Sequence, residues 1–212
     1  QFIAPYESVF TNSQQSDTKE LVLRCMYQMI QTRASNIRSG WKVVFAVLRA
    51  AALDPQASVL PLAFETLQLV IDSYFAVVVA EEFLDLVCCT MGFVHQQARP
   101  EVAHQALEYM KHFIQELANG AVVERDEEGM FTSSESHNAA WFPTLAELSA
   151  LAKLSHHPMQ QGAMGVLYGS LTQYGDRIDP SLWSLIFKGV LFPMFDSVGE
   201  NEEWTKVVLA TS

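Results

Sequence analysis

Ala63-Phe64-Glu65-Thr66-Leu67-Gln68-Leu69-Val70-Ile71 carries an apolar pattern that occurs three times along the chain. In each copy an alanine is followed by a larger apolar residue four positions on, and by further apolar residues seven or eight positions on. These spacings put all members of one copy on the same face of an α-helix. The three copies are Ala63/Leu67/Val70-Ile71, Ala106/Met110/Phe113-Ile114 and Ala163/Leu167/Leu171.

The three alanines are 43 and 57 residues apart, and each copy follows a proline, at Pro55, Pro100 and Pro158. A repeat of about forty residues with two helices per unit is typical of HEAT and armadillo arrays, in which neighbouring units bury each other's apolar faces. No segment alternates apolar and polar residues as a half-buried strand does. The sequence therefore predicts an all-α solenoid of HEAT/armadillo-like helix pairs, with about nine or ten helices. We expect it to form a single regulatory domain over residues 1–212.

The longer interval contains residues 120–139, where Glu124, Asp126, Glu127 and Glu128 are followed by polar residues. We expect an acidic surface loop there. Around it the periodicity predicts a short first helix and further helices that begin at Asp17 with a Glu20 capping box. The remaining predicted helices cover residues 36–53, 59–75, 81–97, 101–119, 141–154, the stretch from Pro158 to Gly175, and 180–198, the last kinked at Pro193.

The helix predicted from Asn36 to Leu53 has two stripes of different character. Ile37, Trp41, Val44, Leu48 and Ala51 form an apolar stripe, and Arg38, Lys42, Phe45 and Arg49 form a second stripe about 100° further round. Gly40 in the first turn lets another backbone approach closely. The second stripe is either a solvated face or a binding surface, and the candidate interaction residues are Asn36, Arg38, Ser39, Lys42, Phe45 and Arg49.

Composition excludes several classes of protein. Half of the 212 residues are hydrophobic and 17% are charged, as in a globular chain, and the net charge of −11 argues against nucleic-acid binding. The charge is uneven: the first fifty residues sum to +3 and the rest to −14, an asymmetry suited to docking. Cys25, Cys88 and Cys89 make no disulfide framework and are expected to be buried, reduced thiols of a cytosolic protein. The sequence has neither an initiator methionine nor a signal peptide, and we interpret it as part of a longer chain.

No pattern typical of catalysis stands out. His156 and His157 are adjacent, so on a helix they would point about 100° apart, and no further ligand flanks them at metal-binding spacing. Gly162, Gly165 and Gly169 lie inside a predicted helix, where small residues suit close helix packing, and do not form a phosphate-binding loop. We therefore expect no catalytic residue, cofactor or metal, and no enzymatic activity in this chain.

Asn36-Ile37-Arg38-Ser39-Gly40-Trp41-Lys42, together with the preceding Glu20–Cys25 run, resembles the region downstream of the catalytic domain in large Arf guanine-nucleotide exchange factors of the brefeldin-A-inhibited, trans-Golgi type. The resemblance continues in the same order through the rest of the chain and is closest to the HDS (homology downstream of Sec-seven) domains. Its signature residues are Gly40, Trp41, Trp141, Phe142, Pro143, Phe195 and Asp196.

The resemblance implies a non-catalytic regulatory module that acts in membrane recruitment, autoinhibition or small-GTPase binding during Golgi vesicle trafficking. Implied partners are GTPases of the Arf or Rab class, other domains of the same exchange factor and the peripheral Golgi membrane. The implied location is the cytoplasm and the surface of Golgi or trans-Golgi membranes. Two alternatives remain: a structural spacer, in which the cations are only solvated, and a cargo-binding solenoid, which needs a longer superhelix than this chain supplies.

Overall fold

A computed structural model describes residues 3–56, 58–120, 134–154 and 157–198 of the chain. In these ranges the chain forms nine α-helices and no strand. Short 3₁₀ turns and one π-helical segment, Phe187–Leu191, join some of them. The helices are α1 (Ala4–Asn12), α2 (Ser16–Arg33), α3 (Trp41–Ala52), α4 (Val59–Val94), α5 (Pro100–Ala118), α6 (Ser134–Ala152), α7 (Gln160–Tyr174), α8 (Pro180–Ile186) and α9 (Phe192–Val198). The all-α prediction is confirmed.

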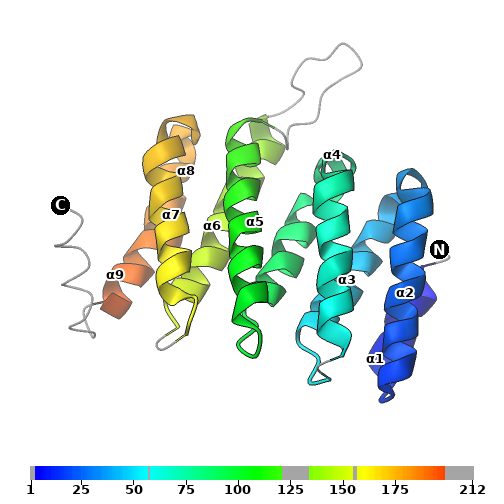
Figure 1. Cartoon of the computed structure of the whole chain (residues 1–212). Helices are drawn as coiled ribbons and strands as arrows, with labels where there is room; N and C mark the ends of the chain where they lie inside the picture. The colour runs from blue at the N-terminus through cyan, green and yellow to red at the C-terminus, as the bar shows by residue number, and fades with distance from the viewer. Residues whose placement is uncertain (1–2, 57, 121–133, 155–156, 199–212) are drawn as a thin grey trace, which may run out of the picture.

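The helices stand in two layers (Figure 1). One layer holds α2, the first half of α4, α5 and α7, side by side in chain order. The other holds α1, α3, the second half of α4, α6 and α8, and each helix contacts the next one in its layer. The chain thus alternates between layers, as expected of stacked helix pairs.

Hydrogen bonds between neighbouring units reveal the repeat directly. Six side-chain bonds join residues 41 to 44 positions apart, close to the spacing of 43 in the sequence. Across the acidic insertion the corresponding separation is 59, where Arg177 donates to the carbonyl of Ala118. Ala63, Ala106 and Ala163 are all fully buried, so the face predicted for each copy is the packed one. The six bonded pairs are Ser16–Ser58, Gln56–Gln14, Gln68–Tyr109, Tyr74–Gln31, Gln96–Ala52 and Ser149–Val190.

The helices predicted over 59–75 and 81–97 are the two halves of α4, which is kinked at Glu82 (φ −137°, ψ 37°). The residues between them contain neither glycine nor proline, so nothing in the local sequence ends the first helix. The kink carries the chain from one layer to the other without a loop. It also gives Glu82 an unusual position, at the junction of two layers.

Two local predictions are wrong. The capping box is absent: Gln15 precedes α2 without a side-chain cap, and the Ser16 hydroxyl donates to Glu20 instead. Residues 134–139 belong to α6 and not to a loop, so Pro143 is inside this helix. The acidic residues of the predicted loop lie outside the described residues. The kink expected at Pro193 corresponds to the π-helical segment that separates α8 from α9.

The first half of α4, Val59–Ala80, is long and apolar enough by composition to cross a membrane, with a mean hydropathy of 1.6. In the structure it packs between neighbouring helices, and Ala63, Leu67 and Val70 are fully buried. Glu65 and Asp72 lie on its exposed side. Its buried side, 44% of the apolar window, belongs to the core.

The expectation of close packing at the α7 glycines holds for Gly162, where an added Cβ would lie 2.7 Å from Cδ2 of Leu107. It is wrong for Gly165 and Gly169, because an added Cβ meets no atom within 4 Å at either position. We expect Gly165→Ala and Gly169→Ala each to raise the free energy of unfolding by about 0.5–1 kcal/mol, since alanine is the better helix former. Urea titration measures this. Gly189→Ala is the contrasting control: its Cβ would lie 2.7 Å from the Phe142 ring, so that variant should be destabilised.

Candidate interaction surface

The connection between α2 and α3 consists of two successive 3₁₀ turns, Ala34–Asn36 and Arg38–Gly40. The predicted helix from Asn36 therefore begins five residues later, at Trp41. Ile37 anchors the connection in the core, whereas Asn36, Arg38 and Ser39 are exposed. Arg38 has a φ of 45° and is the only non-glycine residue with positive φ in the described part of the chain. Because L-residues are strained in this region, the turn holds Arg38 at a cost in stability.

Gly40 has a close neighbour, but this is the end of a side chain and not the backbone that the sequence predicted. A Cβ at Gly40 would lie 2.6 Å from Cδ1 of Ile3, next to the start of α1. The signature motif thus fixes the first helix against the connection that carries Arg38.

Phe45 does not belong to the surface. Its side chain is 2% exposed, and its ring stacks on Trp41 with centroids 6.1 Å apart. The reason is that α3 contacts both α1 and α4. The buried face of α3 is therefore wide, and it includes Phe45 of the stripe that the sequence assigned to the surface.

Lys42 is exposed, but its ammonium group forms an ion pair with the Glu82 carboxylate at 3.6 Å. The Lys42 side chain is 65% exposed and that of Glu82 only 9%. Burial raises the pKa of Glu82, as does its hydrogen bond with Asp85, while Lys42 acts in the opposite direction. Lys42 therefore faces solvent and also stabilises a buried acid at the kink of α4.

Arg49 lies about two helical turns beyond Lys42 on α3. It is exposed, and its stem lies against Gly92 of α4, where an added Cβ would be 3.4 Å from its Cγ. The predicted residues thus divide into two groups. We call Asn36, Arg38, Ser39 and Lys42 the Arg38 edge, and Arg49 is separate from it.

Arg33 is a further cation, outside the two predicted stripes. It is the last residue of α2, is exposed, and stands at the start of the same connection. The sequence signal for Arg33 was its place as a basic residue just before a short connection. The periodicity of the next predicted helix does not include it, because Arg33 belongs to the preceding helix.

The other signature residues are mainly structural. Trp141 is fully buried, and Phe142 and Pro143 are half-buried in α6. Phe195 is 51% exposed on α9, and the side chain of Asp196 lies outside the described residues.

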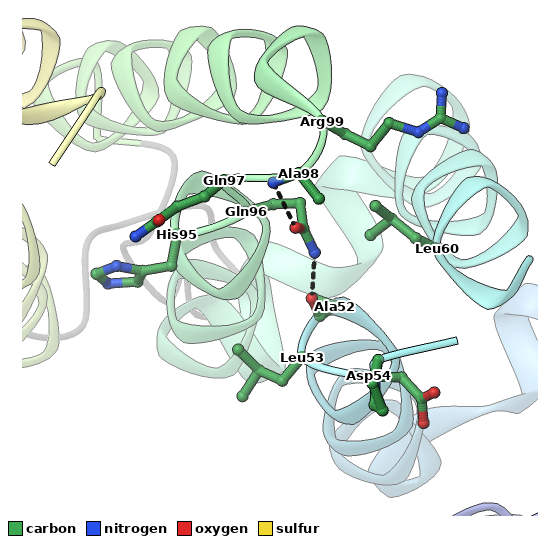
Figure 2. Close-up of a pocket in the computed structure, with 10 residues that line it drawn as sticks. Ala52, Leu53, Asp54, Leu60, His95, Gln96, Gln97, Ala98 and Arg99 are labelled. Carbon is green, nitrogen blue, oxygen red and sulfur yellow. Dashed lines mark hydrogen bonds between the residues drawn. The ribbon is translucent and has the colours of Figure 1, made fainter. Parts of the chain in front are cut away.

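A hollow of about 460 Å³ lies beyond the other end of α3 from the Arg38 edge (Figure 2). Gln96 connects two sides of the hollow. Its side-chain Nε2 donates to the Ala52 carbonyl (2.8 Å), and its Oε1 accepts from the Ala98 N–H (3.1 Å). The titratable groups around it, Asp54, His95 and Arg99, point in different directions. Asp54 is paired with Lys19, and Arg99 is 3.2 Å from Glu101. The hollow therefore lacks converging groups of the kind that catalysis needs.

The remaining chemistry of the described residues is also structural. They contain no group of three His, Cys, Asp or Glu side chains placed to hold a metal. Burial raises the pKa of the Cys89 thiol, which suppresses the reactive thiolate, whereas Cys25 and Cys88 are only half-buried. The ring of His157 packs against that of His95, and its Nδ1 accepts the N–H of Met159; His156 lies outside the described residues.

Comparison with known proteins points to one group. The family model described as "Mon2/Sec7/BIG1-like, HDS" matches residues 1–69, which include the Arg38 edge. Over 95% of its length the chain is 30% identical to brefeldin A-inhibited guanine nucleotide-exchange protein 3 of Arabidopsis thaliana. Over 97% it is 29% identical to protein 1 of that plant and 28% identical to protein 1 of Homo sapiens. The chain spans 13%, 14% and 11% of the length of these relatives, respectively.

Proposed function

Because the chain belongs, through its HDS region, to the family of brefeldin A-inhibited guanine nucleotide-exchange proteins, we propose that it is a regulatory docking module of a large Arf exchange factor. The matched region is the HDS region and not the exchange domain, so the chain has no catalytic role of its own. The module binds an acidic surface of an activated small GTPase of the Arf or Rab class through the Arg38 edge.

The observation that carries this proposal is the state of Arg38. Its side chain is exposed and has no hydrogen bond or ion pair to any other described residue, yet its backbone is strained. Strain of this kind costs of order 1–3 kcal/mol and is found most often at binding and switch sites. A spacer has no use for a strained, unpaired cation, so this feature favours docking.

We extend the proposal to the wider role that the family resemblance implies. Docking an activated GTPase would recruit the exchange factor to Golgi or trans-Golgi membranes from the cytoplasm. Contacts with other domains of the same factor would use the same module for autoinhibition. The excess of cations in the first fifty residues supports attraction to an acidic partner or an anionic membrane, and the net charge of −11 disfavours nucleic acid.

The test is binding of the purified chain to GTP-loaded and GDP-loaded Arf, with and without anionic vesicles. We expect Arg38→Glu to weaken binding to GTP-loaded Arf by about three- to tenfold and to flatten its salt dependence. Binding that is equal in both nucleotide states and insensitive to Arg38 would favour the cargo-binding solenoid. An absence of binding to either form would favour the spacer.

Arg38→Gly separates binding from folding. Glycine adopts positive φ without strain, so this variant should be more stable than the parent by about 1 kcal/mol, as thermal unfolding measures. It lacks the guanidinium and should still bind GTP-loaded Arf less tightly. Loss of binding in a stabilised protein cannot be attributed to unfolding. If Arg38→Gly binds normally, the cation is not part of the interface.

A further inference from the structure

Lys42 differs from the other cations that form ion pairs in the described residues. Lys19 and Asp54 are both buried, and Arg24, Arg99 and Lys111 pair with acids that are more exposed than Glu82. Among the ion pairs of the described residues, only Lys42–Glu82 combines a cation that is 65% exposed with a carboxylate that is 9% exposed. Its ammonium group is therefore open to a partner from solvent on one side, while a buried acid holds it from the other.

Glu82 depends on this contact. It lies at the kink of α4, in a non-helical backbone conformation, and its side chain is only 9% exposed. The charged groups that act on it are Lys42 from α3 and Asp85 from α4, and only Lys42 favours its ionised form. If a partner draws Lys42 away, Glu82 remains buried next to Asp85, and both of these disfavour its ionised form.

We propose that Glu82 competes with an acidic partner for the ammonium group of Lys42, so that this buried carboxylate limits how tightly the Arg38 edge binds. The inference rests on the proposed function, because it concerns the same surface. Binding through Lys42 is then coupled to proton uptake by Glu82, since a protonated Glu82 no longer needs the lysine. The edge binds its partner more tightly as the pH falls towards the pKa of Glu82.

The first test uses affinity for GTP-loaded Arf. Glu82→Gln keeps the size and hydrogen-bonding capacity of the side chain but removes its charge, and a neutral group is less costly to bury. We expect it to tighten binding by about two- to fivefold, the range of a partly exposed ion pair. The gain should vanish when Glu82→Gln is combined with Lys42→Gln, because the competition acts only through the lysine.

The second test needs no partner. Carbon-13 NMR titration of the Glu82 carboxyl in the free chain should show a higher pKa in Lys42→Gln than in the parent, whereas Arg49→Gln should leave it unchanged. Adding GTP-loaded Arf to the parent should raise the pKa of Glu82 in the same direction. Circular dichroism of each variant verifies that the helices are retained.

The outcomes are distinct from those of the proposed function. If Arg38→Glu weakens binding but Glu82→Gln does not strengthen it, docking stands and the competition is wrong. The competition is also wrong if Lys42→Gln leaves the pKa of Glu82 unchanged. If Arg38→Glu has no effect on binding, the docking function fails, and a Lys42-dependent pKa of Glu82 then shows an ion pair with only a structural role, which overturns the inference as well.

Discussion

Trp41→Ala is expected to lower the free energy of unfolding by about 3–5 kcal/mol, the usual cost of deleting a large aromatic side chain from a core. Trp41 is fully buried, stacks on Phe45, and lies directly after the turn that carries Arg38. A whole domain is stable by only about 5–15 kcal/mol. The midpoint of urea denaturation should fall accordingly, and the variant should be partly unfolded at moderate temperature.

Trp41→Phe should be far milder than its size change suggests. The indole Nε1 of Trp41 is buried without a hydrogen-bond partner among the described residues. An unsatisfied buried donor costs about 1–3 kcal/mol, and phenylalanine removes that donor. The gain offsets much of the lost volume, so we expect a net destabilisation of about 1 kcal/mol or less.

Trp141 is the matched control for this comparison, because it is equally buried but its Nε1 is not among the buried atoms that lack a hydrogen-bond partner. Trp141→Phe should therefore cost more than Trp41→Phe. Equal losses in the two variants would mean that the unpaired N–H of Trp41 carries no penalty. Binding measured on Trp41→Ala says little about the Arg38 edge, since the edge is built on this side chain.

The repeat could be predicted from sequence because each copy places a small residue and large apolar residues at fixed positions. A further copy was missed. Forty-four residues before Ala63, Lys19 occupies the alanine position and is followed by the buried Leu23 and Met26. A lysine at the alanine position of an apolar face interrupts the repeat pattern in the sequence. It is accommodated because Asp54 reaches it from the following unit.

The candidate surface was predictable only in part, for a related reason. Periodicity assigns residues to the faces of an isolated helix, but the number of neighbours decides how much of the helix is buried. Phe45 is buried because α3 has neighbours on two sides, and Lys42 is paired because α4 bends at Glu82. The left-handed conformation of Arg38 has no sequence signal at all, since arginine is not a residue that favours it.

Lys19 and Asp54 form the second site where a large effect is expected. The two side chains are 10% and 6% exposed, and the ion pair connects α2 to the connection between α3 and α4. The Lys19 ammonium also lies 5.5 Å from the centroid of the Phe10 ring of α1. Asp54 accepts the backbone N–H of Gln56 at 2.9 Å with its other oxygen. Three elements of the first two units meet at this pair.

Asp54→Asn should destabilise the chain by about 3–5 kcal/mol, the cost of leaving one partner of a buried ion pair uncompensated. Asparagine keeps an oxygen that accepts the Gln56 N–H. The loss of stability in this variant is therefore due to the missing charge and not to a broken turn. The exposed pair Lys111–Glu108 supplies the control, and Glu108→Gln should change stability by no more than about 0.5 kcal/mol.

The double variant Lys19→Met with Asp54→Asn decides the cause. Methionine fills the apolar space of the lysine stem without a charge, so stability should return to within about 1 kcal/mol of the parent if the uncompensated ammonium is what destabilises Asp54→Asn. Because the pair is buried, its contribution should also change little between low and high salt, unlike that of Lys111–Glu108. If the double variant is as unstable as Asp54→Asn alone, the uncompensated ammonium is not the cause of the loss, and the buried lysine is tolerated without a counter-charge.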